Sequence, residues 1–495
     1  MTDRKNDYIL ALALCAALAV YPLMRGGWDL WSQLALQLTL LSCAGAWVLS
    51  NIARGRLPLP PQASLLPACV LLLGFVSLQA SPARSLARPE YQWWAAAVSL
   101  AFLAPFTQLR WRDNAVTALL SVGVATVPLA FYQRFLLDAP GAQEATGPFF
   151  NANMYAGYLL LLLPLALAGR KWVSAGFLLC GLVLAGSRGA WLVLALTAGL
   201  WGVCGTRRKL VWGLLLGLCA LAGILAFWHW GGVAPHERLA WWCSALQMIA
   251  ESPLLGFGPG TFEYVFPAFH EQASGGLSSI YAHNWPLQFA AEYGLPCALV
   301  WLFWAVSRLR RLEAGYRWAV IAVFLHSLGD FTLNGPALFF IFCWLLSCAD
   351  SEGAYAALPG DKPVIAGATA LAVAAFIQLA FIIPRPWLAQ RGLIAARNAY
   401  HSEYPAHGLS GMQRLLIAYP DDSNAALLLA SAMADSAYSS GDRALLAQSA
   451  VAYERAVRLN PFRPATYTEM AALCQALGRP QDAELVLRRK AERFR

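Results

Sequence analysis

Charged residues are scarce in this 495-residue chain, at 13%, whereas hydrophobic residues make up 59% of it. Soluble domains carry about 25% charged residues, so a single soluble core is excluded for most of the length. Apolar runs of about 17–25 residues cross the hydrocarbon core of a bilayer, and runs near that length recur over the first 383 residues. The sequence predicts an all-α, polytopic membrane protein with twelve or thirteen transmembrane helices. The predicted spans are 7–24, 28–50, 64–80, 91–107, 114–133, 153–169, 172–187, 189–205, 210–228, 286–307, 316–333, 336–349 and 363–383. The 336–349 run is short and is the least certain of them.

Several kinds of site are also missing. The 11 Cys residues form no CxxC motif and no metal-ligand spacing, which argues against a zinc or dithiol centre. The glycine-rich stretch 256–262 has no strand before it and no helical context of the dinucleotide-binding kind, so it is predicted to be a rigid turn. The predicted outer loops contain no Asp-x-Asp pair for a divalent metal, and no Walker loop occurs. The sequence therefore predicts no cofactor and no metal, and any diphosphate chemistry would depend on arginines and on a substrate that is already activated.

Lys and Arg residues are distributed unevenly between the predicted loops. Basic residues near helix ends remain in the cytoplasm, and an inside N-terminus gives the inner loops the larger set. The few left for the outer side, up to the last helix, are Arg25, Arg84, Arg88, Arg134, Arg188 and Arg238. This orientation places the polar loop 229–285 outside, together with everything after Phe381. The net charge of +9 follows from this topology and does not predict a nucleic-acid partner.

Composition changes at Pro384-Arg385-Pro386, after which the chain is charged, Ala-rich and helical in pattern. The sequence predicts two domains, a transmembrane domain over 1–383 and a helical repeat domain over 384–495. Helix pairs near 386–418, 423–458 and 463–493, with Gly478 at a turn and Pro461 after a helix, resemble tetratricopeptide repeats. Such a domain is either a cap or spacer, or a concave surface that binds an acceptor or partner.

Three residues of the predicted outer face can carry chemistry. His283 ends the polar loop, and an imidazole with an ordinary pKa near 6.5 accepts a proton from an alcohol near neutral pH. Arg238 lies in the first turn of an amphipathic segment, where a cation opposes the helix dipole, and this favours an anion-binding role. Arg188 sits in the tight turn Gly186-Ser187-Arg188-Gly189 between two apolar helices, and phosphate suits its bidentate donors. A structural histidine and arginines that meet lipid headgroups are the alternative interpretation.

An ordered set of short motifs resembles the O-antigen ligase/polymerase superfamily over about residues 140–310. The set consists of Thr146-Gly147-Pro148-Phe149-Phe150-Asn151-Ala152-Asn153, Gly186-Ser187-Arg188-Gly189, Arg238-Leu239-Ala240-Trp241-Trp242, Ser252-Pro253-Leu254-Leu255-Gly256-Phe257-Gly258, Ala282-His283-Asn284 and Glu292-Tyr293-Gly294. The repeats after a thirteenth span resemble the arrangement in protein O-oligosaccharyltransferases, although some polymerases also carry such repeats.

The resemblance implies a glycosyltransferase of the bacterial inner membrane. Its donor would be a glycan on undecaprenyl diphosphate, and its acceptor lipid A core, a growing polysaccharide or a protein hydroxyl at the periplasmic face. It implies that Arg188 and Arg238 hold the diphosphate and that His283 activates the acceptor. Substrate-binding roles are expected for Asn151, Asn153, Asn284 and Glu292.

Two other classes of function remain open at this stage. A transporter or lipid flippase of polysaccharide export would use His326 and Asp330 as a proton relay, but it would place its key residues near the membrane midplane. A scaffold that recruits other proteins through the repeats would leave the arginines and His283 without a purpose. Because the candidate residues gather at one face, the enzyme is the preferred interpretation.

Overall fold

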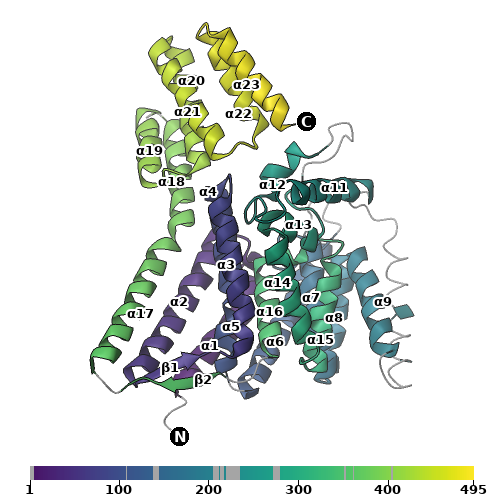
Figure 1. Ribbon diagram of the computed structural model, residues 1–495. Coiled ribbons are helices and arrows are strands. Elements are labelled where there is room, and N and C mark those ends of the chain that lie inside the picture. The colour runs from purple at the N-terminus through teal and green to yellow at the C-terminus, as the bar shows by residue number, and fades with distance from the viewer. Residues whose placement is uncertain are drawn as a thin grey trace.

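The computed structural model describes residues 5–107, 109–137, 144–203, 235–270, 279–349, 353–359, 362–402 and 405–494, together with residues 211, 217 and 218. The described chain is almost entirely helical and forms an all-α polytopic membrane protein (Figure 1). Its apolar helices and their flanking segments are α1 (Lys5–Val20), α2 (Leu30–Ala53), α3 (Leu65–Ala80), α4 (Arg84–Val98), α5 (Leu100–Leu103), α6 (Leu109–Phe135), α7 (Ala152–Ala168), α8 (Trp172–Ala185), α9 (Arg188–Val203), α14 (Leu295–Leu309), α15 (Ala314–His326), α16 (Pro336–Ser347) and α17 (Lys362–Ile382).

Helices occupy the predicted spans that fall within the described residues, whereas the predicted span 210–228 lies outside them. Within the described chain, four helical stretches, 30–53, 62–80, 111–135 and 362–400, are long and apolar enough to cross a membrane by themselves. Several other apolar helices are shorter. Shorter helices suffice where neighbouring helices, rather than lipid, surround the backbone.

The predicted span 286–307 is wrong in one respect, because it consists of two helices, α13 (Trp285–Tyr293) and α14. They meet at Gly294, which has a φ of +82°. A Cβ there would collide with the carbonyl group of Leu254, and the amide of Leu295 donates to Pro253 O at 2.8 Å. The backbone of the preceding loop therefore approaches the chain at this point, and only glycine leaves room for it.

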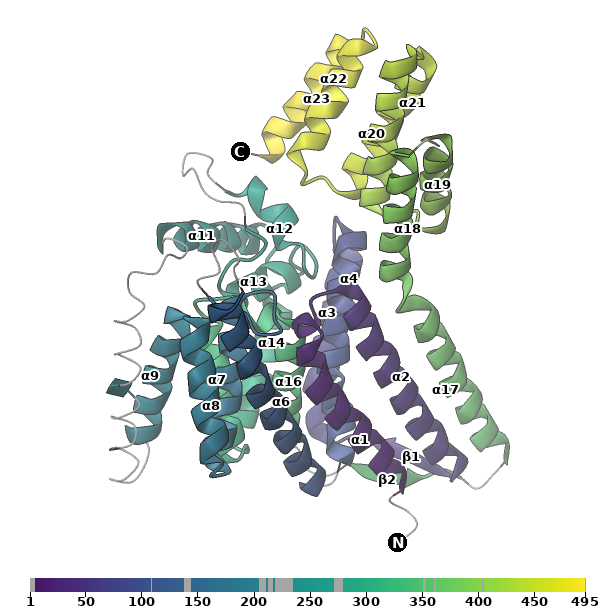
Figure 2. The ribbon, with the colours of Figure 1, turned by 180° about the vertical axis from the view of Figure 1, so that it is seen from behind.

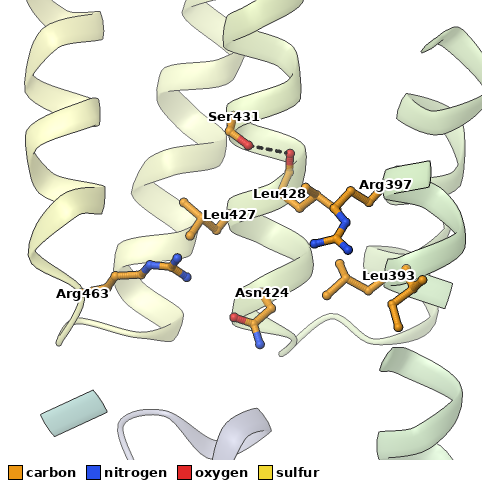
Figure 3. A pocket seen from close by; sticks show the side chains of 8 residues that line it. Leu393, Arg397, Asn424, Leu427, Leu428, Ser431 and Arg463 are labelled. Atoms are coloured by element: carbon orange, nitrogen blue, oxygen red, sulfur yellow. Dashed lines mark hydrogen bonds between the residues drawn. The ribbon is translucent and has the colours of Figure 1, made fainter. Parts of the chain in front are cut away.

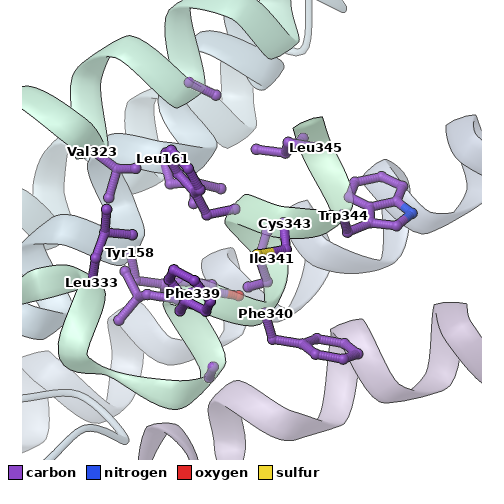
Figure 4. Close-up of a cluster of buried hydrophobic side chains, with 14 of the residues drawn as sticks. Tyr158, Leu161, Val323, Leu333, Phe339, Phe340, Ile341, Cys343, Trp344 and Leu345 are labelled. Atoms are coloured by element: carbon purple, nitrogen blue, oxygen red, sulfur yellow. The ribbon is translucent and has the colours of Figure 1, made fainter. Parts of the chain in front are cut away.

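The predicted span 316–333 also ends early. Its helix, α15, stops at His326, and a short turn that includes the 3₁₀ helix η8 (Thr332–Asn334) leads to α16. Every residue of α16 is buried, and aromatic and aliphatic side chains surround it (Figure 4). With 12 residues at about 1.5 Å each, α16 is about 18 Å long, which is short for a span of about 30 Å. Protein on all sides of α16 makes this length sufficient.

A two-stranded sheet marks one end of the bundle and is a small exception to the predicted all-α fold. Strands β1 (Arg56–Leu59) and β2 (Ala354–Ala357) are antiparallel, with Arg56 opposite Ala357. We call this end the sheet side, and the opposite end, where α11 (Pro235–Glu251), α12 (Phe262–Val265) and α13 lie, the loop side (Figure 1). The helix α16 runs from the loop side toward β2, and α17 returns to the loop side (Figures 1 and 2).

Three consecutive helix pairs follow α17, as the sequence predicts. They are α18 (Arg385–Tyr400) with α19 (Pro405–Ala418), α20 (Ser423–Ser440) with α21 (Arg443–Leu459), and α22 (Pro464–Ala476) with α23 (Pro480–Arg493). Gly441 and Gly478 take positive φ at the turns within the last two pairs. Their identity as tetratricopeptide repeats stays a prediction.

The C-terminal helices sit on the loop side and contact the rest of the chain there (Figures 1 and 2). Arg88 at the start of α4 pairs with Asp421 at 2.5 Å. The ring of Phe462 meets that of Phe257 edge-on, with centroids 5.6 Å apart. The C-terminal helices and the candidate functional loop are therefore on the same side of the membrane helices.

Candidate active site

The helix α11 lies across the loop-side ends of the membrane helices (Figure 1). Trp241, Ala245 and Met248 are buried against the protein, whereas Leu239 and Leu246 are more than half exposed. The exposed pair lies on the apolar stripe that the sequence predicts to face the bilayer surface. Packing on one face and apolar exposure on another fix the orientation of α11, and with it the place of Arg238.

His283 is held in an unusual backbone conformation just before α13. Its φ is +51°, a region that non-glycine residues rarely adopt. The imidazole stacks on Trp241, with centroids 4.9 Å and planes 20° apart, and Phe331 meets it edge-on at 4.7 Å. The next residue, Asn284, caps α13 by accepting from the amide of Leu287 at 3.2 Å. The aromatic rings and the helix cap together position His283, which is 8% exposed.

The Nδ1 atom of His283 faces the carboxylate of Asp330. The distance to Asp330 Oδ1 is 3.7 Å, too long for a hydrogen bond, and Nδ1 is buried with no hydrogen-bond partner in the described part of the chain. Burial, followed by the positive charge of Arg238, lowers the pKa of His283 to about 4. Burial raises the pKa of Asp330 to about 6, against the opposing effects of the Phe331 amide and Arg238.

Arg238 connects α11 to the turn that carries Asp330. Its Nη1 donates to the carbonyl of Gly329 at 3.0 Å. Its Nε is buried without a hydrogen-bond partner among the described residues. An unpaired guanidinium donor is costly to bury, and an anion at this position would satisfy it.

Arg188 is exposed and begins α9, two residues after Gly186, which takes a left-handed conformation. The charges of Arg188 and Arg134 both act on the carboxyl of Glu144, whose pKa burial nevertheless raises. Gly189, the next residue, lies close to His326, since a Cβ on it would be 3.5 Å from His326 Nε2. A helix N-terminus with an exposed arginine favours an anion.

The turn between α15 and α16 joins these elements. His326 Nδ1 and Thr332 Oγ1 are 2.6 Å apart, and the amide of Phe331 donates to Asp330 Oδ1 at 2.7 Å. Gly329 of this turn accepts from Arg238 on α11, and Asp330 of the turn faces His283. His326, which ends α15, lies close to Gly189 on α9. His326 and Asp330 therefore lie at the loop-side end of the bundle, which is a poor position for a relay at the midplane.

Three of the four predicted substrate-binding residues have identifiable structural roles. Asn151 caps α7, since its side chain accepts from the amide of Asn153 at 2.8 Å, and Asn284 caps α13. Glu292 accepts from the amide of Phe262 at 3.0 Å and from Gln288 at 3.1 Å. The side chain of Asn153 is half-buried.

The loop from Gly256 to Phe262 is a tight turn, since Gly256, Gly258 and Gly260 all take positive φ. The amide of Phe257 donates to Ala291 O at 3.0 Å, and that of Gly258 to Glu292 O at 2.8 Å. Main chain and side chain of Glu292 thus both hold this loop against α13. The predicted rigid turn fits these contacts.

The helix pairs enclose a separate groove of about 270 Å³. Arg397 and Arg463 reach into it from opposite sides, and Leu393 and Leu427 also line it (Figure 3). The groove is amphipathic and basic.

Sequence reasoning gave Asp330 no role beside His283 and singled out neither Trp241 nor Asn334. The sequence feature that could have indicated Asp330 is the turn Gly329-Asp330-Phe331. This turn follows an apolar run and lies on the same side of the membrane helices as His283. The contact between His283 and Asp330 joins two loops that are 47 positions apart in the sequence, and the periodicity of the sequence does not indicate such contacts. No group of three or more His, Cys, Asp or Glu suited to a metal occurs among the described residues.

Part of the chain matches the model of a known protein family. Residues 173–302 match the family model described as O-antigen ligase, and this segment runs from α8 to α14. It contains Arg188, Arg238, His283, Asn284 and Glu292, whereas Asn151 and Asn153 precede it. A comparison with curated proteins finds none that matches the chain. Residues 173–302 of this helical membrane protein are thus similar to the O-antigen ligase family.

Proposed function

We propose that this protein transfers a glycan from an undecaprenyl-diphosphate-linked donor to an acceptor hydroxyl at the periplasmic face of the inner membrane. The observation that carries the proposal is the convergence of Arg238, His283 and Asp330 at one end of the bundle. Arg238 and His283 lie inside the O-antigen ligase segment, and Asp330 follows it. A base beside a cation is the arrangement that nucleophilic displacement of an anionic leaving group needs.

In the proposed reaction, His283 takes the proton of the acceptor hydroxyl. Because Nδ1 faces Asp330, Nε2 is the nitrogen left for the acceptor. The acceptor oxygen bonds to the anomeric carbon as the bond from that carbon to the phosphate oxygen breaks, and the lipid diphosphate leaves with the electron pair. Direct displacement inverts the configuration at this carbon.

Arg188 and Arg238 stabilise the departing diphosphate in this proposal, without a metal ion. Arg238 has a buried donor that is free for a phosphate oxygen, and Arg188 stands exposed at a helix N-terminus. A diphosphate near Arg238 also changes the base. It neutralises the charge that helps to lower the pKa of His283, so donor binding makes His283 a stronger base.

The acceptor class is the finer part of the proposal. The C-terminal helices contact the functional loop through Phe462 and Phe257, and they contact α4 through Asp421 and Arg88. A basic groove next to the loop, lined by Arg397 and Arg463, supports a role in docking the acceptor, be it lipid A core, a polysaccharide or a protein. The same arrangement suits ligase, polymerase and protein O-oligosaccharyltransferase reactions.

The experiment is reconstitution. Purified protein is incubated with a lipid-linked glycan and each acceptor class in turn, and the products are identified by mass spectrometry. A product that grows by one donor glycan, absent with His283→Ala, is expected. Equal product from the His283→Ala protein would contradict the proposal.

A further inference from the structure

A second polar cavity lies beside the candidate active site. It has a volume of about 300 Å³ and is lined by residues of α2, α4, α12 and α13 and of the segments next to them. Binding pockets for small ligands have about 300–1,000 Å³, so this cavity suits a short saccharide. The lining residues that matter here are Trp28, Glu90, Glu263, Tyr264, Glu292 and Asn334.

Three carboxylates from separate elements line this cavity. Glu90 comes from α4, Glu263 from α12 and Glu292 from α13. Two of them are held in place by protein donors: Trp93 Nε1 donates to Glu90 Oε2 at 2.9 Å, and Gln288 Nε2 donates to Glu292 Oε1 at 3.1 Å. Carboxyl groups fixed in this way can form hydrogen bonds with the hydroxyl groups of a ligand, whether the carboxyl group is ionised or protonated.

One buried polar atom in the cavity has no protein partner. Asn334 is 5% exposed, and its Oδ1 is buried without a hydrogen-bond partner in the described part of the chain. Leaving a buried acceptor unpaired costs about 1–3 kcal/mol. A ligand that donates a hydrogen bond inside the cavity would remove this cost.

Aromatic rings supply the apolar part of the cavity. Trp28, Trp93, Tyr264 and Tyr281 all line it. Rings carry negative charge on their faces, which suits the C–H faces of a sugar ring. Aromatic faces together with carboxyl and amide groups match a ligand rich in hydroxyl groups. No Lys or Arg occurs among the described residues that line the cavity, so the ligand should carry no negative charge of its own.

The cavity is connected to His283 by short contacts. Tyr281 stacks on Phe331 with centroids 4.8 Å apart, and Phe331 meets His283 at 4.7 Å. Gln288, which donates to Glu292, also accepts from the amide of Ala282 at 3.1 Å. A ligand in the cavity would therefore lie next to the segment that positions the base.

We infer that this cavity, between α4, α12 and α13, is a subsite for a neutral or amino sugar and rejects uronic acids and phosphorylated sugars. The inference rests on the proposed function, because glycans are the substrates that would reach the site. The sugar belongs either to the acceptor or to the donor glycan. The recognition chemistry is the same in both cases.

The test is direct sugar binding, which does not depend on catalysis. Saturation-transfer NMR on the purified full-length protein would compare a hexosamine, an N-acetylhexosamine and a hexuronic acid. We expect a signal from the first two and none from the third. Glu90→Gln combined with Glu263→Gln should reduce the signal at least about fivefold, whereas Glu251→Gln, an exposed carboxylate of α11 outside the cavity, should leave it unchanged.

The outcomes separate this inference from the proposed function. His283→Ala should keep sugar binding, since the cavity is intact. A sugar signal that survives the double substitution, or a hexuronic acid that binds as well as the neutral sugars, would overturn the subsite even if transfer is normal. Sugar binding without any transfer would leave the subsite standing and sink the proposed reaction. Competition of the free sugar with the acceptor, or instead with the lipid-linked donor, identifies the source of the bound sugar.

Discussion

The Nδ1 atom of His283 lies 3.7 Å from Oδ1 of Asp330, although 47 positions separate the two residues in the sequence. The imidazole is clamped between Trp241 and Phe331, and the carboxylate is fixed by the amide of Phe331. A carboxylate on this side of the ring stabilises the imidazolium that forms when the other nitrogen takes a proton. The arrangement predicts how substitutions and pH alter transfer.

Replacing His283 by Ala or Gln should abolish detectable transfer, with a loss of at least about 10²–10⁴-fold, because general bases contribute about that much. Membrane insertion and yield should be normal. Transfer is measured by mass spectrometry of the product, and His401→Gln, an exposed histidine of the C-terminal helices, serves as the control. Full activity in either His283 variant would reject His283 as the base.

The pH profile of kcat/KM should have two steps on its acid side. Burial raises the pKa of Asp330 to about 6, so its charge is lost as the pH falls through about 6. Burial and Arg238 lower the pKa of His283 to about 4, so the imidazole stays neutral until the pH falls near 4. Asp330→Asn should lower kcat by about 10-fold or more, by analogy with carboxylates that orient a catalytic histidine, and remove the step near 6. A step that persists in that variant would contradict the assignment.

Arg188→Lys and Arg238→Lys should each reduce transfer substantially, because lysine keeps the charge but loses the bidentate donors of arginine. We expect weaker binding of undecaprenyl diphosphate in both variants. Arg84→Lys, an exposed arginine at the start of α4, is the matched control. Addition of EDTA should leave the wild-type rate unchanged, and loss of activity that magnesium or manganese restores would show that a metal holds the diphosphate.

Gly294→Ala should destabilise the protein by more than about 1 kcal/mol, because a positive φ and a nearby carbonyl both oppose a side chain. The carbonyl is that of Leu254, and φ is +82°. Thermal unfolding in detergent measures the change. Gly199→Ala in α9, where no atom lies within 4 Å of the added Cβ, should leave the midpoint unchanged or raise it. Equal midpoints for Gly294→Ala and the wild type would show that the loop can move away.

A reporter that is active only in the periplasm, fused after Arg495, should be active. The reason is that α16 runs from the loop side to β2 and α17 returns, which places the C-terminal helices on the loop side, where α11 and α13 also lie (Figure 2). A cytoplasm-specific reporter at the same position should be silent. The reverse result would exclude any role of the C-terminal helices in acceptor docking.

The sequence predicts the membrane helices well, because apolar runs report burial in lipid or protein directly. The three C-terminal helix pairs follow in the same way from helical spacing and from turns such as Gly478. The break at Gly294 was not predictable, since it depends on the approach of Leu254 from another segment. The proximity of Asp330 to His283, and of Glu90 to Glu292, depends likewise on packing between helices far apart in the sequence. Motif order indicated Arg188, Arg238 and His283, but it could not show that Asn151 and Asn284 are helix caps.

The helix α17 buries none of its residues and packs mainly against α2. The tilt of a helix with so little protein around it depends on bilayer thickness as well as packing. The C-terminal helices are therefore connected to the bundle through a helix that has little protein around it. The pairs Arg88–Asp421 and Phe257–Phe462 hold them on the loop side. A change in bilayer thickness would therefore strain these two contacts. We expect lipid composition to alter the position of the basic groove relative to the loop that carries His283.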